Sequence, residues 1–533
     1  MAATCAVRAH GGRGGAAAAR GRGIAAGARS RTAMMAARAA PRGVLLETSN
    51  EPPKGAGMSL ALSRGACTDA KDSAPLRAPA EALPPPSGGA DVGLAAPSAS
   101  PATVVSPAEA LPGAPAVPAD DFPISGISVG EALFNACNIL LGVGVLSVPF
   151  ALEEGGWAAL GVLAALAVCT NYTGKALARC QDAGIAPLSA DSAERAKALR
   201  AQAAAGNPLA SYEDIAERAF GERGRQFIQW VLYTELLGTC GLFYILEADH
   251  LEMLFGSPVI AREAFIAASF VLFTPTTWLP DLSALSYVGL LGVVSSLGVT
   301  AVVAQDFFVG HDAVVSSTTS VAHMGTLPVT FGLLAFVFAG HAVFPNIRAS
   351  MREPERFDDV LDLTYAIVGT VCLTIGACGY AAYGSSSAEE ITLNLPAGGA
   401  LATACSLVLV NPFAKYALTL DPVAKELERT LGVSHARGSK TRIMANAART
   451  SLSMAALLLA TSLPLFGYVM SVMGSFLTLT VSLIFPSLCY LKLYDDELRA
   501  GEKFGNWALV SVGGAAAIFG TFTAVSEILE TFH

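Results

Sequence analysis

The sequence predicts an all-α membrane protein that crosses the bilayer many times, and three observations support this prediction. Hydrophobic residues make up 53% of the 533-residue chain and charged residues only 14%, whereas soluble domains carry about 25% charged residues. From Ser128 onward, apolar stretches of about 17 to 29 residues follow one another, each long enough to cross a hydrocarbon core of roughly 30 Å as a helix. Lysine and arginine gather in every second loop, as they do on the cytosolic side of membrane proteins. This composition excludes an ordinary soluble enzyme.

The first 121 residues differ in composition from the remainder. No Phe, Trp or Tyr occurs between Met1 and Asp121, so all 25 Phe, 4 Trp and 12 Tyr lie beyond this segment. Because a chain rich in Ala, Gly and Pro builds no core without larger apolar residues, we expect a disordered tail at 1–121 and a membrane domain at 122–533. Before Glu47 the tail contains arginine and no acidic residue. That pattern is typical of an organelle transit peptide, although a solvated cytosolic tail is the simpler interpretation.

The membrane domain is predicted to contain eleven transmembrane helices. Their limits are 128–152, 156–178, 226–254, 263–279, 283–308, 326–348, 361–383, 398–418, 446–463, 466–491 and 505–529. With the N-terminus in the cytosol, eleven crossings place every one of the 34 Lys and Arg residues on the cytosolic side except Arg262. A miscount by one helix would invert the later loops and destroy this agreement. The C-terminus is therefore expected on the opposite side of the membrane.

Loops and turns separate these spans. The weakest separations are the turns at Pro280 and Pro464, where proline interrupts the helical pattern. The hydrophilic stretch 181–225 is expected to form a cytosolic loop with an amphipathic helical piece at 191–205.

The first span, 128–152, makes a poor continuous helix. Asn138 precedes the run Gly142-Val143-Gly144, and Pro149 follows it. Two glycines cost about 1 kcal/mol each relative to alanine in a helix, and proline removes a backbone donor. We therefore expect this helix to break near Gly142.

The sixth span, 326–348, repeats the pattern. Gly340 is followed by His341 and, five residues after the glycine, by Pro345. Irregular backbone at membrane depth persists where the freed N–H and C=O groups line a cavity or contact a ligand. The alternative for either span is a simple proline kink packed against a neighbouring helix.

The two breaks occupy corresponding positions in the chain. Spans one and six open two blocks of five helices, and because five is odd the second block starts from the opposite side of the membrane. This arrangement predicts an inverted repeat with a binding site near the midplane, where half-helix N-termini face an anionic group and unwound carbonyls face a cation. An amino acid carries both groups on one carbon.

Several motifs resemble those of one known family. The matching runs are 134–151 with 155–157, 232–236, 245–251, 340–347 with 350–351, 392–396 and 411–418. Together they resemble the amino acid/auxin permease family, and within it the vacuolar amino acid transporter branch, which is related to the vesicular inhibitory amino acid transporters. The resemblance covers roughly residues 125 to 530 and leaves out the tail.

This resemblance implies a leucine-transporter-like fold of two inverted five-helix repeats plus one helix. It also implies proton-coupled transport of amino acids, with the Gly142-Val143-Gly144 backbone receiving the substrate carboxylate and the break around Gly340-His341 facing the amino group. The predicted substrate-binding residues are Asn138, Gly142, Val143, Gly144, Phe338, Gly340 and His341.

His341 and Glu235 are the candidates for carrying the coupled proton, because ionisable groups inside spans are rare and costly and histidine titrates near neutral pH. Each has a structural alternative: the imidazole of His341 could hold the broken backbone, and Glu235 could join two helices. Lys415, at the cytosolic end of the eighth span, either extends to the interface or binds Asn411 or a backbone carbonyl. Three ionisable residues near the outer end of the third span are expected to form a solvated face or a gate: Glu247, Asp249 and His250.

The sequence thus predicts a secondary transporter, not an enzyme, that moves neutral amino acids by alternating access. The resemblance to the vacuolar branch implies antiport with protons from the cytosol into an acidic vacuole; symport, sodium coupling and a plasma or plastid membrane are the alternatives. A rival function is an amino acid sensor that signals through its tail. No cofactor or metal is expected, the net charge of -9 argues against a nucleic-acid partner, and the expected partners are the substrate, protons and the lipid bilayer.

Overall fold

The computed structural model describes residues 126–183, 188, 194, 197, 211–256, 261–279, 283–311, 313–433, 439–462 and 466–532. The predicted tail, the turns at Pro280 and Pro464 and nearly all of the amphipathic piece at 191–205 lie outside these residues. The described part of the chain is helical almost throughout. This confirms the predicted all-α class.

The helices follow one another along the chain. Their bounds are α2 Val129–Leu140, η1 Val143–Ser147, α3 Val148–Gly155, α4 Ala158–Cys180, α6 Tyr212–Phe255, α7 Arg262–Thr277, α8 Ser283–Gln305, η2 Asp306–Gly310, α9 Leu327–Val337, α10 Phe344–Ser350, η3 Pro354–Arg356, α11 Phe357–Tyr383, η4 Gly384–Ser386, η5 Ile391–Asn394, α12 Gly399–Leu431, α13 Ser439–Ser462, α14 Phe466–Val472, η7 Met473–Thr478, η8 Thr480–Ile484, α15 Phe485–Leu493 and α16 Ala500–Phe532.

Eight helices of the described residues are long and apolar enough to cross a membrane, and a ninth span results if α2 and the bent segment after it count as one. The chain is therefore an integral membrane protein. The predicted count of eleven is not confirmed. Helix α7 has 16 residues, which is shorter than a full crossing. The predicted sixth span is divided into α9 with 11 residues and α10 with 7, and neither of these two helices crosses the membrane by itself.

The first predicted break is confirmed at Gly142. Helix α2 starts at a capping box, in which the Ser128 N–H donates to Glu131 Oε2 at 2.7 Å and the Glu131 N–H donates to Ser128 Oγ at 3.3 Å. It stops because Gly142 adopts an extended backbone (φ −98°, ψ −160°). The chain then bends by 46° into η1 and α3. Pro149 lies in the first turn of α3, where its missing N–H has no helical partner to lose.

The second predicted break is confirmed between Val337 and Phe344. Helix α9 ends at Val337, a turn covers 338–343, and α10 starts at Phe344 with Pro345 in its first turn. In both broken spans, proline lies in the first turn of the second half-helix, and the helix is interrupted in the glycine-containing segment before it.

The two breaks pack directly against each other. A Cβ added to Gly144 would lie 3.1 Å from Val337 Cα, and one added to Gly340 would lie 2.7 Å from Leu140 Cδ2. Small residues allow such close approach between helices in membranes, where packing rather than hydrophobic burial drives association. The backbones before α2 and after α10 also meet, because the Ile127 N–H donates to the Ser350 carbonyl at 2.8 Å.

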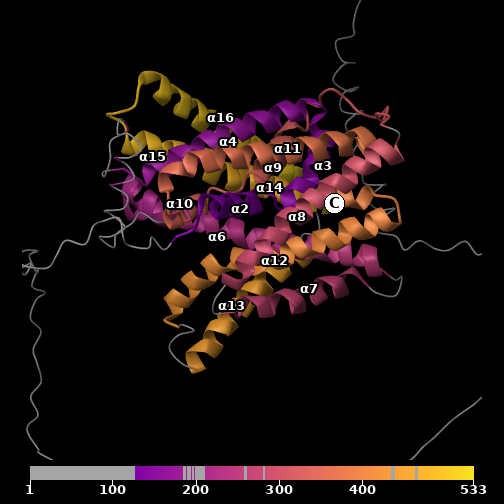
Figure 1. Cartoon of the computed structure of the whole chain (residues 1–533), viewed down its shortest axis with the longest axis horizontal. Helices are drawn as coiled ribbons and strands as arrows, with labels where there is room; N and C mark the ends of the chain where they lie inside the picture. Colours follow the sequence, from indigo (N-terminus) through magenta and orange to yellow (C-terminus); the bar gives the residue numbers. More distant parts are fainter. Residues whose placement is uncertain are drawn as a thin grey trace, which may run out of the picture. The chain divides into compact units, whose positions relative to one another are not determined.

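Other helices enclose this pair of breaks. Helix α12 packs along α6 and α8, with α7 and α13 beside them, while α4 and α16 lie on the other side of the described domain (Figure 1). The segment Phe466–Leu493 is central, with 78% of its apolar window buried, whereas Ala500–Glu530 is peripheral, with 22%. The broken spans therefore lie in the protein interior, where a cavity can form between them and α8 or α12.

Helix α6 is longer than predicted. It begins at Tyr212, whereas the sequence predicted a loop up to 225. A capping box at Ser211 starts it, with the Asp214 N–H donating to Ser211 Oγ at 3.2 Å. Gly221 then takes a positive φ of 69° and bends the helix before it becomes apolar. The loop expectation was wrong here because it followed hydropathy and not capping.

Candidate functional site

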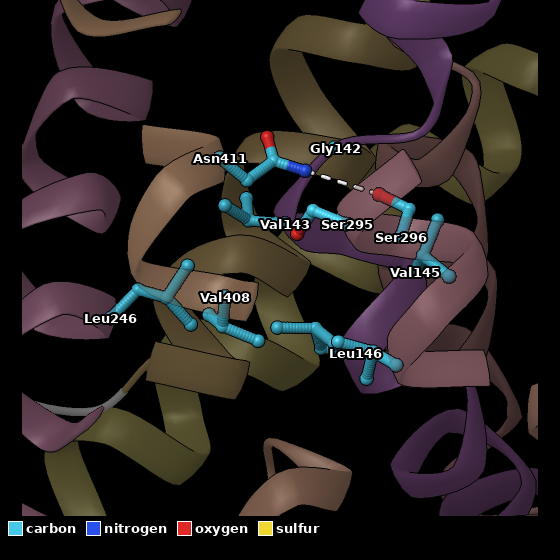
Figure 2. A pocket seen from close by; sticks show the side chains of 10 residues that line it. Gly142, Val143, Val145, Leu146, Leu246, Ser295, Ser296, Val408 and Asn411 are labelled. Carbon is cyan, nitrogen blue, oxygen red and sulfur yellow. Dashed lines mark hydrogen bonds between the residues drawn. The ribbon is translucent and has the colours of Figure 1, made fainter. Parts of the chain in front are cut away.

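A small cavity lies at the break of the first span. Its lining residues come from this break, α6, α8 and α12 and are Gly142, Val143, Val145, Leu146, Leu246, Ser295, Ser296, Val299, Val408 and Asn411. Figure 2 shows their side chains gathered around the bend between α2 and η1. The free space is on the order of one water molecule, so a larger molecule requires the surrounding helices to move apart.

The polar end of the cavity is built around the Leu141 carbonyl, just beyond the last residue of α2. It accepts hydrogen bonds from Ser296 Oγ at 3.1 Å, Asn411 Nδ2 at 3.3 Å and Lys415 Nζ at 2.9 Å. Asn411 Nδ2 also donates to Ser296 Oγ at 3.1 Å, the bond drawn in Figure 2. The last carbonyls of a helix have no partner within it, and α8 and α12 supply the missing donors here.

Most of the other lining side chains are aliphatic. They are Val143, Val145, Leu146, Leu246, Val299 and Val408, and Leu246, Val408 and Leu146 lie together at the end of the cavity opposite Asn411 (Figure 2). No lining residue carries a charged side chain. The cavity therefore offers backbone, hydroxyl and amide groups at one end and an apolar surface at the other, an arrangement typical of small-molecule sites.

The structure brings only part of the predicted substrate site to this cavity. Gly142 and Val143 line it. Asn138 lies close by, since a Cβ on Gly292 of α8 would be 2.6 Å from Asn138 Oδ1, and that buried oxygen has no hydrogen-bond partner among the described residues. Gly144 faces Val337 instead.

The predicted residues of the sixth span lie outside the lining. Phe338 stacks on Tyr365 with 5.6 Å between ring centroids, and Gly340 contacts α2. His341 is fully buried, with its Nε2 3.1 Å from both Thr173 Oγ1 and the Thr170 carbonyl of α4. These contacts hold the broken backbone against α4.

Glu235, the second candidate proton carrier, is also buried away from the cavity lining. Its Oε1 accepts a hydrogen bond from Thr478 Oγ1 of η7 at 2.5 Å, which joins α6 to the centrally buried segment Phe466–Leu493. This geometry corresponds to the predicted structural alternative, a carboxyl group that links two helices.

Sequence reasoning missed the serines of α8. Ser295 and Ser296 are an adjacent polar pair in the middle of α8, and Ser295 Oγ donates to the Leu407 carbonyl of α12 at 2.5 Å. This serine pair was the sequence feature that could have identified α8 as part of the cavity lining. The alternative in which Lys415 binds a backbone carbonyl is confirmed by its bond to Leu141.

A second polar cluster lies near the end of α6 opposite its capping box. Asp249 Oδ1 accepts two bonds from Arg262, at 2.9 and 2.6 Å, and His250 Nε2 lies 2.7 Å from Thr392 Oγ1. Glu247 and His250 are almost completely buried, so the expectation of a solvated face is wrong for these two residues.

Glu389 and Glu390 extend this cluster from the loop between α11 and α12. The Gly467 N–H donates to Glu389 Oε2 at 3.0 Å. Burial raises the pKa of Glu389 from its ordinary 4.5 to about 7, and burial together with the charge of Asp249 raises the pKa of Glu390 well above its ordinary value.

Comparison with known proteins adds a family assignment to this geometry. The family model described as "Transmembrane amino acid transporter protein" matches residues 125–526. Amino acid transporter AVT1B of Arabidopsis thaliana is 35% identical over 418 residues, covering 76% of this chain and 72% of that protein. Amino acid transporter ANT1 of the same plant is 26% identical over 418 residues, covering 74% and 91%.

Solved structures share low sequence identity with the chain. MhsT in complex with L-phenylalanine is 11% identical with a TM-score of 0.45, covering 74% of this chain and 99% of that one. Mhp1, a nucleobase-cation-symport-1 family transporter in a closed conformation, is also 11% identical with a TM-score of 0.45, covering 77% and 96%. TM-scores below 0.5 do not by themselves establish a shared arrangement of helices.

Proposed function

Because the chain belongs to the transmembrane amino acid transporter family, we propose that it moves neutral amino acids across an organelle membrane by alternating access, as a proton-coupled secondary transporter. The family and the curated relatives support amino acid transport. The neutral substrate, the proton coupling and the mode of access are our proposals.

The proposal that the substrate is a neutral amino acid rests on the cavity at Gly142. A substrate carboxylate would lie against the first N–H groups of η1, where the helix start is electropositive. Its amino group would bind Asn411 Oδ1, a buried acceptor with no partner among the described residues. The aliphatic end would receive an uncharged side chain, because a charged one would have no partner there.

This placement assigns the amino group to Asn411 and not to the break at Gly340-His341. Gly340 contacts α2 and His341 contacts α4. These two residues would therefore support the backbone around the site without contacting the substrate. The paired breaks support a two-block inverted repeat, which stays a prediction.

Antiport into an acidic vacuole is the preferred direction, with the N-terminus cytosolic and the C-terminus lumenal. Two sequence features support it: the resemblance to the vacuolar branch and the concentration of Lys and Arg in the loops assigned to the cytosol. Symport in the opposite direction uses the same site and differs only in the gradients.

The experiment is uptake of labelled amino acids by proteoliposomes that contain the purified full-length protein. We expect saturable uptake of a neutral amino acid that collapses when the pH difference is removed and does not change with a sodium gradient. Empty liposomes are the control. Binding without accumulation under either gradient would contradict the transporter and favour the sensor.

A further inference from the structure

We propose that Lys415 supplies the cation at the first helix break and that release of its proton couples amino acid binding to proton movement. This inference rests on the proposed function and identifies the group behind its coupling. It starts from one contact that substrate transport by itself does not explain: a lysine ammonium held inside the bundle, at the edge of the cavity.

The ammonium group of Lys415 lies at the C-terminal end of α2. Its Nζ lies 2.9 Å from the Leu141 carbonyl, its side chain is almost completely buried, and a Cβ on Gly142 would lie 3.9 Å from the same Nζ. The C-terminal end of a half-helix carries partial negative charge, and in broken helices such ends coordinate the coupling sodium ion or proton. The ammonium occupies this place.

The same carbonyl is not available to a sodium ion. A carbonyl oxygen has two lone pairs, and the Leu141 oxygen already accepts from Ser296, Asn411 and Lys415. A metal ion there would need to displace donors held by two different helices.

No carboxylate of the described residues forms an ion pair with Lys415. The other titratable side chains of α2, α6, α7, α12 and α13, with Asp306 just after α8, are Glu131, Cys137, Tyr212, Glu213, Asp214, Glu217, Arg218, Glu222, Arg223, Arg225, Tyr233, Glu235, Cys240, Tyr244, Glu247, Asp249, His250, Glu252, Arg262, Glu263, Asp306, Cys405, Tyr416, Asp421, Lys425, Glu426, Glu428, Arg429, Lys440, Arg442 and Arg449. Asp421 of its own helix is paired with Lys425 and Arg449 instead. A buried ammonium without a counter-charge is costly, so loss of its proton is favourable when a second cation approaches.

The second cation is the amino group of the substrate. In the proposed pose it binds Asn411 Oδ1, the buried acceptor without a partner among the described residues, on the same side chain that donates to the Leu141 carbonyl held by Lys415. One N–H bond of the lysine ammonium then breaks, the electron pair stays on nitrogen, and the proton passes to water in the open access path. Binding one zwitterionic substrate therefore releases one proton, which is the exchange that an antiporter requires.

The test uses full-length protein in proteoliposomes with Lys415→Met, Lys415→Arg and Lys425→Met. Lys425 is the matched control because it lies on the same helix but has an exposed side chain. We expect both Lys415 variants to lose accumulation driven by a pH difference by at least ten-fold, and Lys415→Met to keep slower exchange of labelled for unlabelled substrate. Lys425→Met should accumulate substrate as the natural protein does. Accumulation with the natural pH profile in either Lys415 variant would overturn the proposal.

A second measurement does not depend on transport. The melting temperatures of the natural protein and of Lys415→Met are compared between pH 5 and pH 9. A lysine that titrates makes their difference change with pH, whereas a difference that is constant with pH marks a fixed structural charge and overturns the proposal. If the natural protein neither accumulates nor exchanges any amino acid, the proposed function fails, and this measurement still decides whether Lys415 titrates.

Discussion

Gly142 is the residue at which α2 ends and the cavity begins, and it has no side chain to fill the space. A Cβ there would lie 3.5 Å from the Ile139 carbonyl and 3.9 Å from Lys415 Nζ, which are ordinary contact distances. The backbone is extended and not in the left-handed region. The position therefore tolerates a methyl group, but only by using part of a cavity that is already small.

Gly142→Ala should accordingly fold normally and bind substrate more weakly. We expect KM to rise about ten-fold, which corresponds to about 1.4 kcal/mol, with a melting temperature close to that of the natural protein. Uptake kinetics and thermal unfolding in detergent check both parts. An unchanged KM would show that the substrate does not approach Gly142.

His341 is a residue to which the sequence assigned two possible roles, proton carrier and brace. Its Nε2 contacts two atoms of α4, and these contacts favour the brace. His341→Gln retains a side-chain amide that can donate to the Thr170 carbonyl. We expect this variant to transport with an unchanged pH profile, while His341→Ala loses about 1–3 kcal/mol of stability because a buried partner is left unsatisfied. A flattened pH profile in the glutamine variant would return His341 to the proton path.

Among helical elements, η1 and α9 cross where the backbones of the two broken spans are in close contact. A Cβ on Gly144 would lie 3.1 Å from Val337 Cα and 3.3 Å from its backbone nitrogen. Backbone cannot move aside as a flexible side chain can, so the helices must separate to admit any larger residue.

Gly144→Val should therefore abolish uptake because it forces η1 and α9 apart, and not because it fills the cavity. We expect the variant to insert into the membrane and to lose about 1–3 kcal/mol of stability from overpacking. Uptake and thermal unfolding are measured beside Gly142→Ala, which adds bulk two residues away without a backbone clash. Natural rates of uptake in Gly144→Val would refute the crossing as a functional element.

The loop that carries η4 and η5 adds a pH-dependent element outside the spans. Burial raises the pKa of Glu389 from 4.5 to about 7, so the folded state holds this proton more tightly than the unfolded chain. Its contribution to stability is fully present below pH 4.5 and is lost as the pH rises through about 7.

Glu389→Gln should remove most of that pH dependence. The amide oxygen still accepts from the Gly467 N–H, and no carboxylate has to ionise next to Asp249. We expect the variant to be more stable than the natural protein above pH 7 by on the order of 1–2 kcal/mol and similar to it at pH 4. Melting temperatures across this range provide the measurement, and parallel curves would contradict it.

The elements that the sequence predicted best are those with a local cause. Gly142 takes an extended backbone where α2 ends, and α9 ends at Val337, three residues before Gly340, so both breaks appear where expected. The residues that line the cavity were harder to predict from the sequence. Ser296 and Leu246 reach the break only because α8 and α6 pack there, and such packing depends on contacts between distant helices that no local pattern specifies.

At the scale of the whole molecule, the family match leaves out the first 124 residues, since it covers 125–526. Deleting residues 1–120 should leave uptake within about two-fold of the full-length protein in proteoliposomes, because the cavity is built entirely from later residues. A sensor would instead lose its signal in cells after this deletion. Loss of uptake by the purified truncated protein would show that the tail takes part in transport.

The backbone pairing at the ends of the two broken spans has a consequence for how the whole molecule moves. The Ile127 N–H donates to the Ser350 carbonyl and the Arg352 N–H to the Ile127 carbonyl, at 2.8 and 2.9 Å. The start of α2 and the end of α10 are thus tied by main-chain bonds that no side-chain mutation removes. We therefore expect the start of α2 and the end of α10 to stay together if either half-helix moves during transport.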